Sequence, residues 1–308
     1  MRKKKIIFLV GPTAVGKSEA AVYLAKKINA EIISLDSMQI YKGMDIITSK
    51  PRETLLKRIK HYLIGVVLPS KEYNVSEYRK ASLKIIEEVT DKGKIPLFVG
   101  GTGLYMSVLI DGIFELKSPS GKIRDHLYKI AKNKGSAYLY RKLVKVDPSA
   151  AKKIHPNDLR RIIRALEVFK STGKQISQLQ QLRHGLGDQY DIKVFCLQLD
   201  KIMLYKRIDS RVERMFRQGL LKEVKGLLKK QLSKTASSAI GIKEINGLFD
   251  NQYDLDKAKS LIKQNTRRYA KRQLTWFRKD IRIEWVSVKD KETPKQVAMR
   301  IYRTLSKN

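Results

Sequence analysis

Apolar residues occur along this chain both as short continuous runs and as stripes of helical spacing. Short continuous runs are typical of strands that are buried on both faces, as in a parallel sheet. They occur at residues 6–10, 31–35, 95–99 and 192–199, and residues 281–286, where Arg282 and Glu284 interrupt the apolar residues, also predict a strand. Stripes of helical spacing predict helices over residues 75–90, 159–169 and 257–279, from about 201 to a break at Gly219, and from about 294. This alternation predicts an α/β protein with a parallel sheet flanked by helices.

The character of the chain changes between about residues 115 and 189. Lys, Arg, Ser and Gly become frequent there, and helical periodicity replaces the strand pattern. Asp158 is a good N-cap, and an apolar stripe follows it: Leu159, Ile162, Ile163, Leu166 and Phe169. We therefore expect a helical insertion domain at 115–189, set into a discontinuous core domain made of 1–114 and 190–308.

The first apolar run leads directly into a glycine-rich segment with the spacing G-x-x-x-x-G-K-[ST]. Its residues are Gly11, Pro12, Thr13, Ala14, Val15, Gly16, Lys17 and Ser18. A strand, a glycine turn and a helix start can cradle a phosphate, because backbone N–H groups close on the anion and the helix dipole favours it. Lys17 would neutralise phosphate oxygens, and the Ser18 hydroxyl would bind Mg²⁺. The alternative is a chance glycine turn. The agreement of both flanks instead favours a P-loop NTPase-like fold that binds a di- or triphosphate.

Two polar residues follow later strands of the predicted sheet. Asp36 comes directly after the run at 31–35, and Thr102 follows the run at 95–99 through a Gly-Gly turn. Ligands of open α/β sheets bind at the carboxyl ends of the strands. Asp36 should therefore face the phosphate loop, where it could hold Mg²⁺ through water or act as a base; a turn or N-cap role is the alternative. The Thr102 hydroxyl should lie near the phosphates, and an N-cap role is compatible with that position.

The charge balance points to a polyanionic partner. The chain carries 65 Lys and Arg against 30 Asp and Glu, a formal net charge of +35. We expect RNA or DNA as the partner. A membrane surface is the weaker alternative, because no predicted helix is cleanly basic and amphipathic. Over 257–279, aromatic residues alternate with arginines, which favours nucleic-acid contact over a merely solvated basic helix.

The single cysteine, Cys196, lies in an apolar run and should be a core residue. It excludes an internal disulfide, and no Cys/His cluster suggests zinc. The apolar run after the basic N-terminus is too short for a signal peptide. No segment approaches the roughly 18 apolar residues that a membrane span needs. We therefore expect a cytoplasmic protein with no membrane association.

A phosphate loop with a nearby acid also fits a small-molecule kinase. A family resemblance favours a different class of enzyme. Over nearly its full length, the chain resembles the tRNA dimethylallyltransferase (tRNA isopentenyltransferase) family of the bacterial type. The matching segments are GPTAVGKS (11–18), ISLDSMQIYKGMDIITSKP (33–51), LFVGGTGLY (97–105), VDPSAAKKIHPNDLRRIIRALEV (146–168), RIDSRVERMFRQGLLKEV (207–224) and RRYAKRQLTWFRK (267–279). Ser49 stands where many members have alanine, and we expect this difference to be neutral.

The resemblance implies that dimethylallyl diphosphate donates its five-carbon group to the exocyclic amine of the adenine 3′-adjacent to the anticodon of a tRNA, with release of pyrophosphate. The phosphate loop would hold the diphosphate. The leaving group would be stabilised by Lys17, by Arg211 and by Mg²⁺ on Ser18. Arg211 is chosen over Arg207 and Arg214 by motif alignment. Thr102 would hydrogen-bond the bridging oxygen, and Asp36 would be the base.

The resemblance also implies the residues that contact the tRNA, whose target adenine must leave its stack. They are Asp36, Ser37, Met38, Gln39, Thr102, Arg124, Arg160, Arg161, Arg164, Ser238, Gly241, Lys243, Lys271, Arg272, Gln273, Trp276 and Arg278. We expect a monomer. The alternatives are an adenylate isopentenyltransferase that uses a free nucleotide, a P-loop small-molecule kinase, and an RNA-binding module without enzymatic activity.

Overall fold

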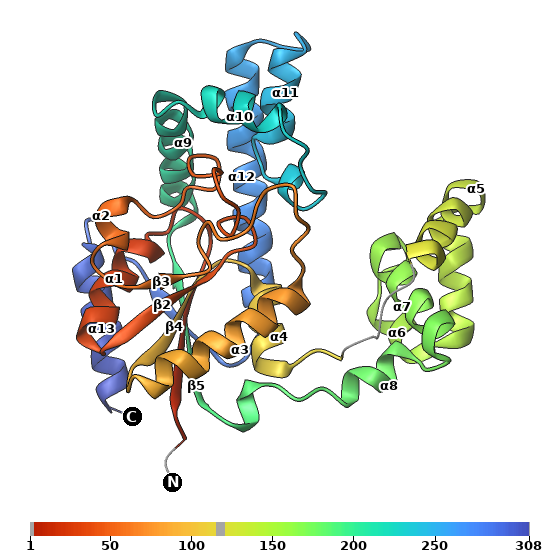
Figure 1. The fold of residues 1–308 in the computed structure, drawn as a ribbon, viewed down its shortest axis with the longest axis horizontal. Helices are drawn as coiled ribbons and strands as arrows, with labels where there is room; N and C mark the ends of the chain where they lie inside the picture. Colours follow the sequence, from red (N-terminus) through yellow and green to blue (C-terminus); the bar gives the residue numbers. More distant parts are fainter. Residues whose placement is uncertain (1–2, 115–120, 308) are drawn as a thin grey trace. The chain divides into compact units, whose positions relative to one another are not determined.

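The computed structural model describes residues 3–114 and 121–307, and the chain divides into two compact units (Figure 1). Unit 1 consists of Met1–Val108 and Gln189–Asn308, and unit 2 consists of Leu109–Asp188. The expected start of the insertion, at about residue 115, lies outside the described residues.

Unit 1 is built around a parallel sheet, as the apolar runs predict. Its six described strands are β1 (Lys5–Val10), β2 (Ala30–Leu35), β3 (His61–Tyr62), β4 (Ile95–Gly100), β5 (Asp191–Gln198) and β6 (Ile283–Ser287). They lie in the order β3-β2-β4-β1-β5-β6, and each neighbouring pair is parallel. The α/β fold class is therefore confirmed. The first two strands are separated by β4, so β4 ends between the phosphate loop and Asp36.

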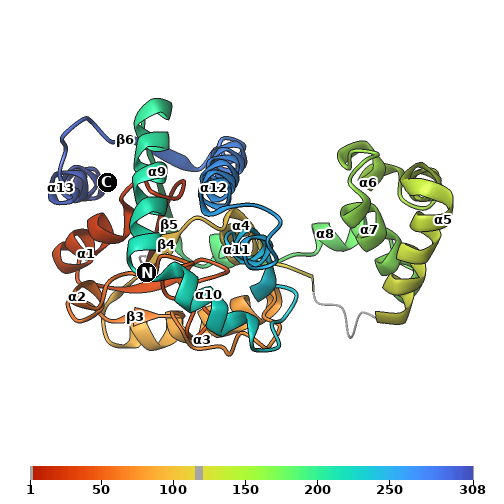
Figure 2. The ribbon, with the colours of Figure 1, turned by 90° about the horizontal axis from the view of Figure 1, so that it is seen from above.

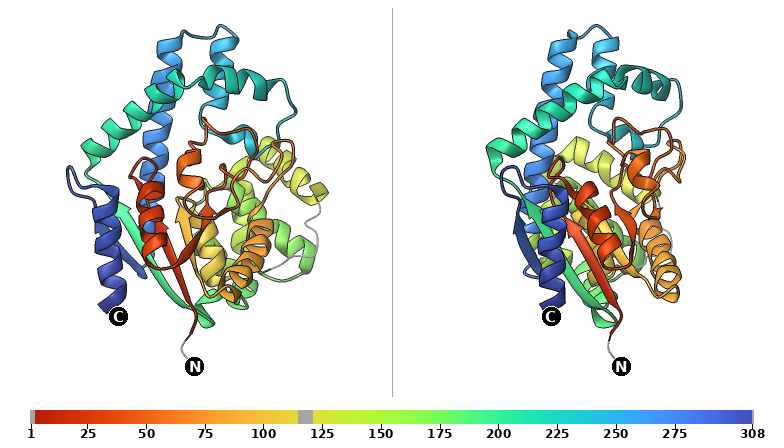
Figure 3. Two further views of the ribbon diagram at one scale, coloured as in Figure 1. Left: turned by 60° about the vertical axis from the view of Figure 1, so that its left-hand side comes forward. Right: turned by 90° about the vertical axis from the view of Figure 1, so that its left-hand side faces the viewer.

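Unit 1 also contains helices. They are α1 (Lys17–Lys27), α2 (Glu53–Leu56), α3 (Val75–Asp91), α4 (Gly103–Asp111, which runs on into unit 2), α9 (Lys201–Arg217), α10 (Leu220–Leu228), the 3₁₀ turn η2 (Ala236–Ser238), α11 (Ile242–Phe249), α12 (Leu255–Phe277) and α13 (Pro294–Lys307). Helices α1 and α13 lie side by side (Figures 2 and 3) and cover one face of the sheet, where Leu24 and Ile301 pack with Leu9. Residues alternate between the faces of a strand, so Phe8 turns away from Leu9 and stacks on Phe98, with ring centroids 4.8 Å apart.

Local sequence signals explain where the helices begin and end. The Asn74 side chain accepts hydrogen bonds from Ser76 N and Glu77 N and completes a capping box that starts α3. Helix α9 ends before Gly219, whose φ of +96° lies in the left-handed region, so the predicted break is confirmed. Cys196 is fully buried in β5, which confirms its place in the core.

Unit 2 is a helical unit with its own core. Its elements are α5 (Gly121–Val146), α6 (Pro148–Lys153), α7 (Leu159–Thr172), α8 (Ile176–Gln181) and the 3₁₀ turn η1 (Leu186–Asp188). Helix α5 is interrupted at Gly135. Asp158 caps α7 by accepting from Arg161 N, and the predicted stripe buries Ile162, Ile163 and Leu166 beside α5. Every helix within the described ranges is too short or too polar to cross a membrane.

Candidate active site

The glycine-rich segment forms a compact loop between β1 and α1. Lys17 Nζ donates to the carbonyl oxygens of Gly11 at 2.9 Å and Pro12 at 2.7 Å. Gly11 has a φ of +144°, and a Cβ there would lie 2.5 Å from the backbone oxygen of Leu197 in β5, so only glycine fits. Gly16 (φ +103°) turns the chain into the helix. The loop therefore directs a cation and the start of α1 toward the carboxyl edge of the sheet.

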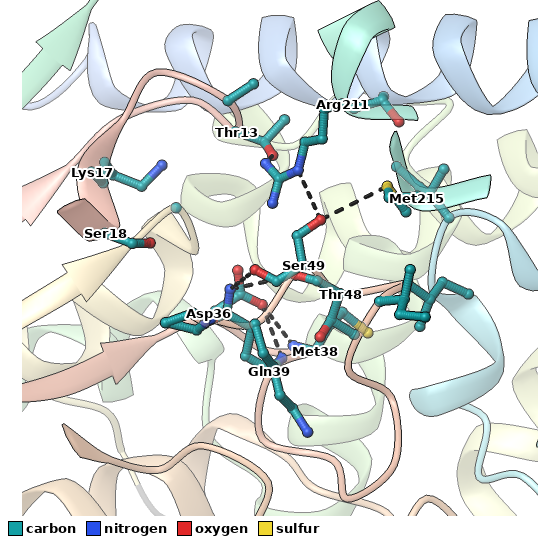
Figure 4. A pocket seen from close by; sticks show the side chains of 18 of the residues that line it. Thr13, Lys17, Ser18, Asp36, Met38, Gln39, Thr48, Ser49, Arg211 and Met215 are labelled. Atoms are coloured by element: carbon teal, nitrogen blue, oxygen red, sulfur yellow. Dashed lines mark hydrogen bonds between the residues drawn. The ribbon is translucent and has the colours of Figure 1, made fainter. Parts of the chain in front are cut away.

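A cavity of about 1230 Å³ opens at this edge, within unit 1 (Figure 4). It brings together many predicted site residues from distant segments: Thr13, Ala14, Gly16, Lys17, Ser18, Asp36, Ser37, Met38, Gln39, Arg211, Ser238, Arg272 and Gln273. Gly11, Pro12 and Val15 belong to the loop but do not line the cavity.

Arg211 reaches the phosphate loop from α9. Its Nη1 donates to Thr13 Oγ1 at 2.7 Å, and its Nε donates to Ser49 Oγ, also at 2.7 Å. Burial lowers the pKa of Arg211 to about 10, with Asp36 opposing that shift and Arg214 adding to it. Burial, then the charge of Arg211, lowers the pKa of Lys17 to about 8, with Asp36 opposing. The two cations thus share one partly desolvated site that an anion would stabilise.

Asp36 ends β2 and is held by the turn that follows it. Its Oδ1 accepts from Met38 N at 2.8 Å and Gln39 N at 3.3 Å, and neither of these contacts uses Oδ2. The Gln39 side chain in turn donates to the carbonyl oxygens of Thr48 and Ser49. Asp36 therefore stabilises a turn, which is the alternative role considered from the sequence. It also lines the cavity, as a carboxylate that acts as a base must.

The half-buried Thr102 follows β4, and its hydroxyl contacts the turn after β2. Its hydroxyl oxygen accepts from Ser37 N at 3.2 Å, and its own N–H donates to Leu35 O. Thr102 is not among the residues that line the cavity, although its neighbour Gly101 is. In this conformation the hydroxyl fixes the turn that carries Asp36.

Helix α12 contributes a side chain that braces the phosphate loop. The buried Gln273 accepts from Thr13 N at 2.8 Å and donates to Gly101 O at 3.0 Å. Two residues from the same helix lie nearby: Tyr269 lines the cavity, and the guanidinium of Arg272 lies 5.7 Å from the Tyr269 ring centroid. Burial raises the pKa of Tyr269 well above its ordinary value, so its hydroxyl stays protonated.

The other residues expected at the tRNA from the C-terminal part of the chain lie outside the cavity lining. Trp276 is 39% exposed and packs so closely that a Cβ on Gly103 would lie 2.2 Å from its Cδ1. Gly241 packs against Ile47, because a Cβ added to Gly241 would lie only 3.2 Å from Ile47 Cδ1. Three exposed cations complete this group: Lys243, Lys271 and Arg278.

The four predicted arginines of unit 2 fall into two groups. Arg124 Nη2 and Arg164 Nη1 each donate to Oε2 of the fully buried Glu167 at 2.9 Å. Arg161 is exposed and pairs with Asp158 at 3.1 Å, and Arg160 is also exposed. Because Arg124 and Arg164 are only partly buried, each still presents N–H groups at the surface of unit 2.

Several cavity residues were not identified as site residues from the sequence. The segment from Asp45 to Glu53 forms one wall, and Arg207, Arg214 and Met215 line it from α9. The sequence contained a signal for these residues, because α9 carries arginines at helical spacing and the segment 45–53 overlaps the family motif at 33–51. The pattern alone did not show that the loop and the helix meet.

The oxygen donors of the site suit a hard cation. Ser18 supplies a hydroxyl and Asp36 a carboxylate at the same cavity. Mg²⁺ in proteins commonly takes one or two such ligands and completes its shell with substrate phosphates and water. Within the described ranges no group of three or more His, Cys, Asp or Glu side chains could hold a metal by itself. The hydroxyl of Ser18 and the carboxylate of Asp36 therefore fit the ligand preferences of Mg²⁺.

A phosphate loop on a parallel sheet, with two cations and a carboxylate around one cavity, is the arrangement of a P-loop-like enzyme. The IPP transferase family model matches residues 39–280. The chain belongs to this family.

Named relatives and a solved structure are similar over most of the chain. It is 46% identical over 286 residues to a tRNA dimethylallyltransferase of Halothermothrix orenii, covering 92% of this chain and 87% of the relative. It is 48% identical over 284 residues to the tRNA dimethylallyltransferase of Carboxydothermus hydrogenoformans, covering 92% and 91%. The full-length tRNA isopentenylpyrophosphate transferase of Bacillus halodurans superposes with a TM-score of 0.74 at 37% identity, covering 99% of this chain and 96% of that one.

Proposed function

We propose that this protein is a tRNA-modifying prenyltransferase, which transfers the dimethylallyl group from dimethylallyl diphosphate to the exocyclic amine of the adenine 3′-adjacent to the anticodon and releases pyrophosphate. One observation carries the proposal. Lys17 and Arg211, both with lowered pKa values, share a cavity with the Asp36 carboxylate. Such a site can hold a diphosphate and accept a proton beside it, and both are needed when an amine displaces an allylic diphosphate.

The charges of the cavity suit the departure of the diphosphate. An allylic C–O bond breaks more readily when the negative charge that collects on the leaving oxygens is stabilised. Lys17 already donates to the loop carbonyls, and Arg211 to Thr13, so both cations need little reorganisation when the charge develops. Mg²⁺ held by Ser18 would add Lewis-acid stabilisation of that charge.

The acceptor amine requires a base and alignment. An aryl amine is a weak nucleophile, so holding it in line with the allylic carbon contributes much of the rate. Asp36 would take the proton as the new C–N bond forms, and its Oδ1 contacts with Met38 N and Gln39 N keep the carboxylate in place. The hydroxyl oxygen of Thr102 accepts from Ser37 N, so its O–H can still donate a hydrogen bond to the diphosphate.

The net charge of +35 supports a tRNA substrate over a free nucleotide. Exposed arginines in unit 2 and exposed cations on α12 can each neutralise phosphates. For six to ten phosphate contacts, affinity should fall about 10³–10⁵-fold between 50 and 200 mM salt. We further infer a monomer that acts where tRNA is found, in the cytoplasm.

The test is transfer of radiolabelled dimethylallyl from its diphosphate to unmodified tRNA, with AMP and ATP as parallel acceptors. We expect label on tRNA, and a loss of about 10²–10⁴-fold in Asp36→Asn, which keeps the shape but not the basicity of the side chain. The same variant should still bind pyrophosphate. Label on the nucleotide alone would indicate an adenylate isopentenyltransferase, and ATP consumption without transfer would indicate a kinase.

A further inference from the structure

Glu223, on α10, holds the loop that forms one wall of the cavity. Its Oε2 accepts from the backbone N–H groups of Asp45 at 3.0 Å and Ile46 at 2.9 Å, and its Oε1 accepts from Ile47 N at 2.9 Å. Three consecutive amides thus converge on one carboxylate that lies 176 residues or more away in sequence. Hydrogen bonds to a charged acceptor are about twice as strong as neutral ones, so this contact is a strong tether.

The tether fixes the turn that carries Ser49. The carbonyl oxygen of Ile46 accepts from Ser49 N at 2.9 Å, and that of Asp45 accepts from Lys50 N at 3.0 Å. The peptide groups 45–46 and 46–47 therefore donate their N–H groups to Glu223 and accept, at their carbonyl oxygens, the hydrogen bonds that close the turn. Ile47 is buried and packs against Gly241, which holds the other side of the loop.

Ser49 connects the tethered turn to Arg211, the cation predicted to stabilise the leaving group. Its φ of +49° lies in the left-handed region, which non-glycine residues seldom adopt without support from their surroundings. Its hydroxyl accepts from Arg211 Nε at 2.7 Å while Arg211 Nη1 donates to Thr13 Oγ1. Figure 4 shows Ser49 between Arg211 and Met215, whose sulfur lies 3.8 Å from the hydroxyl oxygen. The orientation of the guanidinium depends on where the turn places this hydroxyl.

We propose that Glu223 is a positioning residue of the diphosphate site, which acts through the turn at 45–50 and Ser49 to orient Arg211. The proposal rests on the proposed function only for the identity of the substrate, since any diphosphate at the phosphate loop would meet the same guanidinium. Glu223 itself does not line the cavity. On this view Ser49 is not interchangeable with alanine, contrary to the expectation from the family resemblance.

The experiment compares binding of inorganic pyrophosphate with Mg²⁺, by calorimetry, between the wild type and Glu223→Gln. The amide side chain keeps one acceptor oxygen but places an NH₂ group against a backbone N–H, which loosens the tether. From the usual strength of hydrogen bonds to charged groups, we expect pyrophosphate affinity to fall about 10- to 100-fold. Glu87→Gln, an exposed carboxylate on α3, is the matched control and should bind as the wild type does.

A double-mutant cycle separates positioning from a general structural role. If Glu223 acts through Ser49, then Glu223→Gln and Ser49→Ala together should weaken binding no more than the stronger single change. Additive losses, or an unchanged affinity in Glu223→Gln, would overturn the proposal. Should Glu223→Gln fail to fold, Ser49→Gly tests the same link, because glycine tolerates the positive φ and lacks the side chain that carries the hydroxyl; unchanged affinity there would also overturn it. These readouts use pyrophosphate alone, so absence of tRNA prenylation would count against the proposed function and not against this one.

Discussion

The contact between Gln273 and the phosphate loop should be measurable as stability of unit 1. Gln273 is 6% exposed and joins Thr13 N to Gly101 O. Gln273→Ala removes both hydrogen bonds, each worth a net of about 1 kcal/mol. The buried Gly101 carbonyl also loses its partner, at a cost of about 1–3 kcal/mol. Because water can reach the half-buried Thr13, we expect the free energy of unfolding to fall by about 2–4 kcal/mol.

Both tryptophans of the chain, Trp276 and Trp285, belong to unit 1, so their fluorescence in urea follows the unfolding of that unit alone. This removes the main objection to a two-state treatment of a chain with two units. Gln264→Ala, at an exposed position of the same helix, is the control for any change in helix propensity. A difference between the two variants of less than about 1 kcal/mol would show that Gln273 does not brace the loop.

Three further predictions follow from other contacts. Because burial and Arg211 lower the pKa of Lys17 to about 8, pyrophosphate affinity should fall as the pH rises from 7 to 9; a flat titration, or the same slope in Lys17→Met, would contradict this. Gly103→Ala would place a Cβ 2.2 Å from Trp276 Cδ1 and should cost about 1–3 kcal/mol, with a shifted tryptophan emission; an unshifted spectrum would argue against the packing. Leu139→Ala, in the core of unit 2, should destabilise that unit by about 2–5 kcal/mol, seen by hydrogen exchange over α5 and α7, and leave the tryptophan unfolding curve unchanged.

These strands could be predicted from sequence because each predicted segment is short, largely apolar and bounded by turn residues. The five predicted runs correspond to β1, β2, β4, β5 and β6. Their order in the sheet could not be read in the same way. Runs that are buried on both faces are alike in composition, so nothing local indicates that β4 pairs with both β1 and β2.

The site was predictable in part, for a similar reason. The residues of the phosphate loop are contiguous in sequence, and their spacing alone predicts a phosphate-binding turn. Lys17 and Ser18 could therefore be identified from the pattern. The contacts that join distant segments could not. Gln273 was expected at the tRNA, and the sequence did not show that its amide also joins the phosphate loop to Gly101. Thr102 was expected near the phosphates, and the sequence did not show that its hydroxyl also accepts from Ser37 N. A polar side chain can satisfy its hydrogen bonds in several ways, and only tertiary structure selects one.

The electrostatics of the cavity explain why these supporting contacts matter. Burial lowers the pKa values of both Lys17 and Arg211, which means that each cation is held where it is poorly solvated. Without an anion, either side chain would gain by turning toward water. The loop carbonyls hold Lys17, and Thr13 with Ser49 holds Arg211. Neutral oxygens in these positions orient the cations without neutralising them. The full charge therefore remains available to the oxygens of the diphosphate that we propose departs from this site, where it lowers the barrier most.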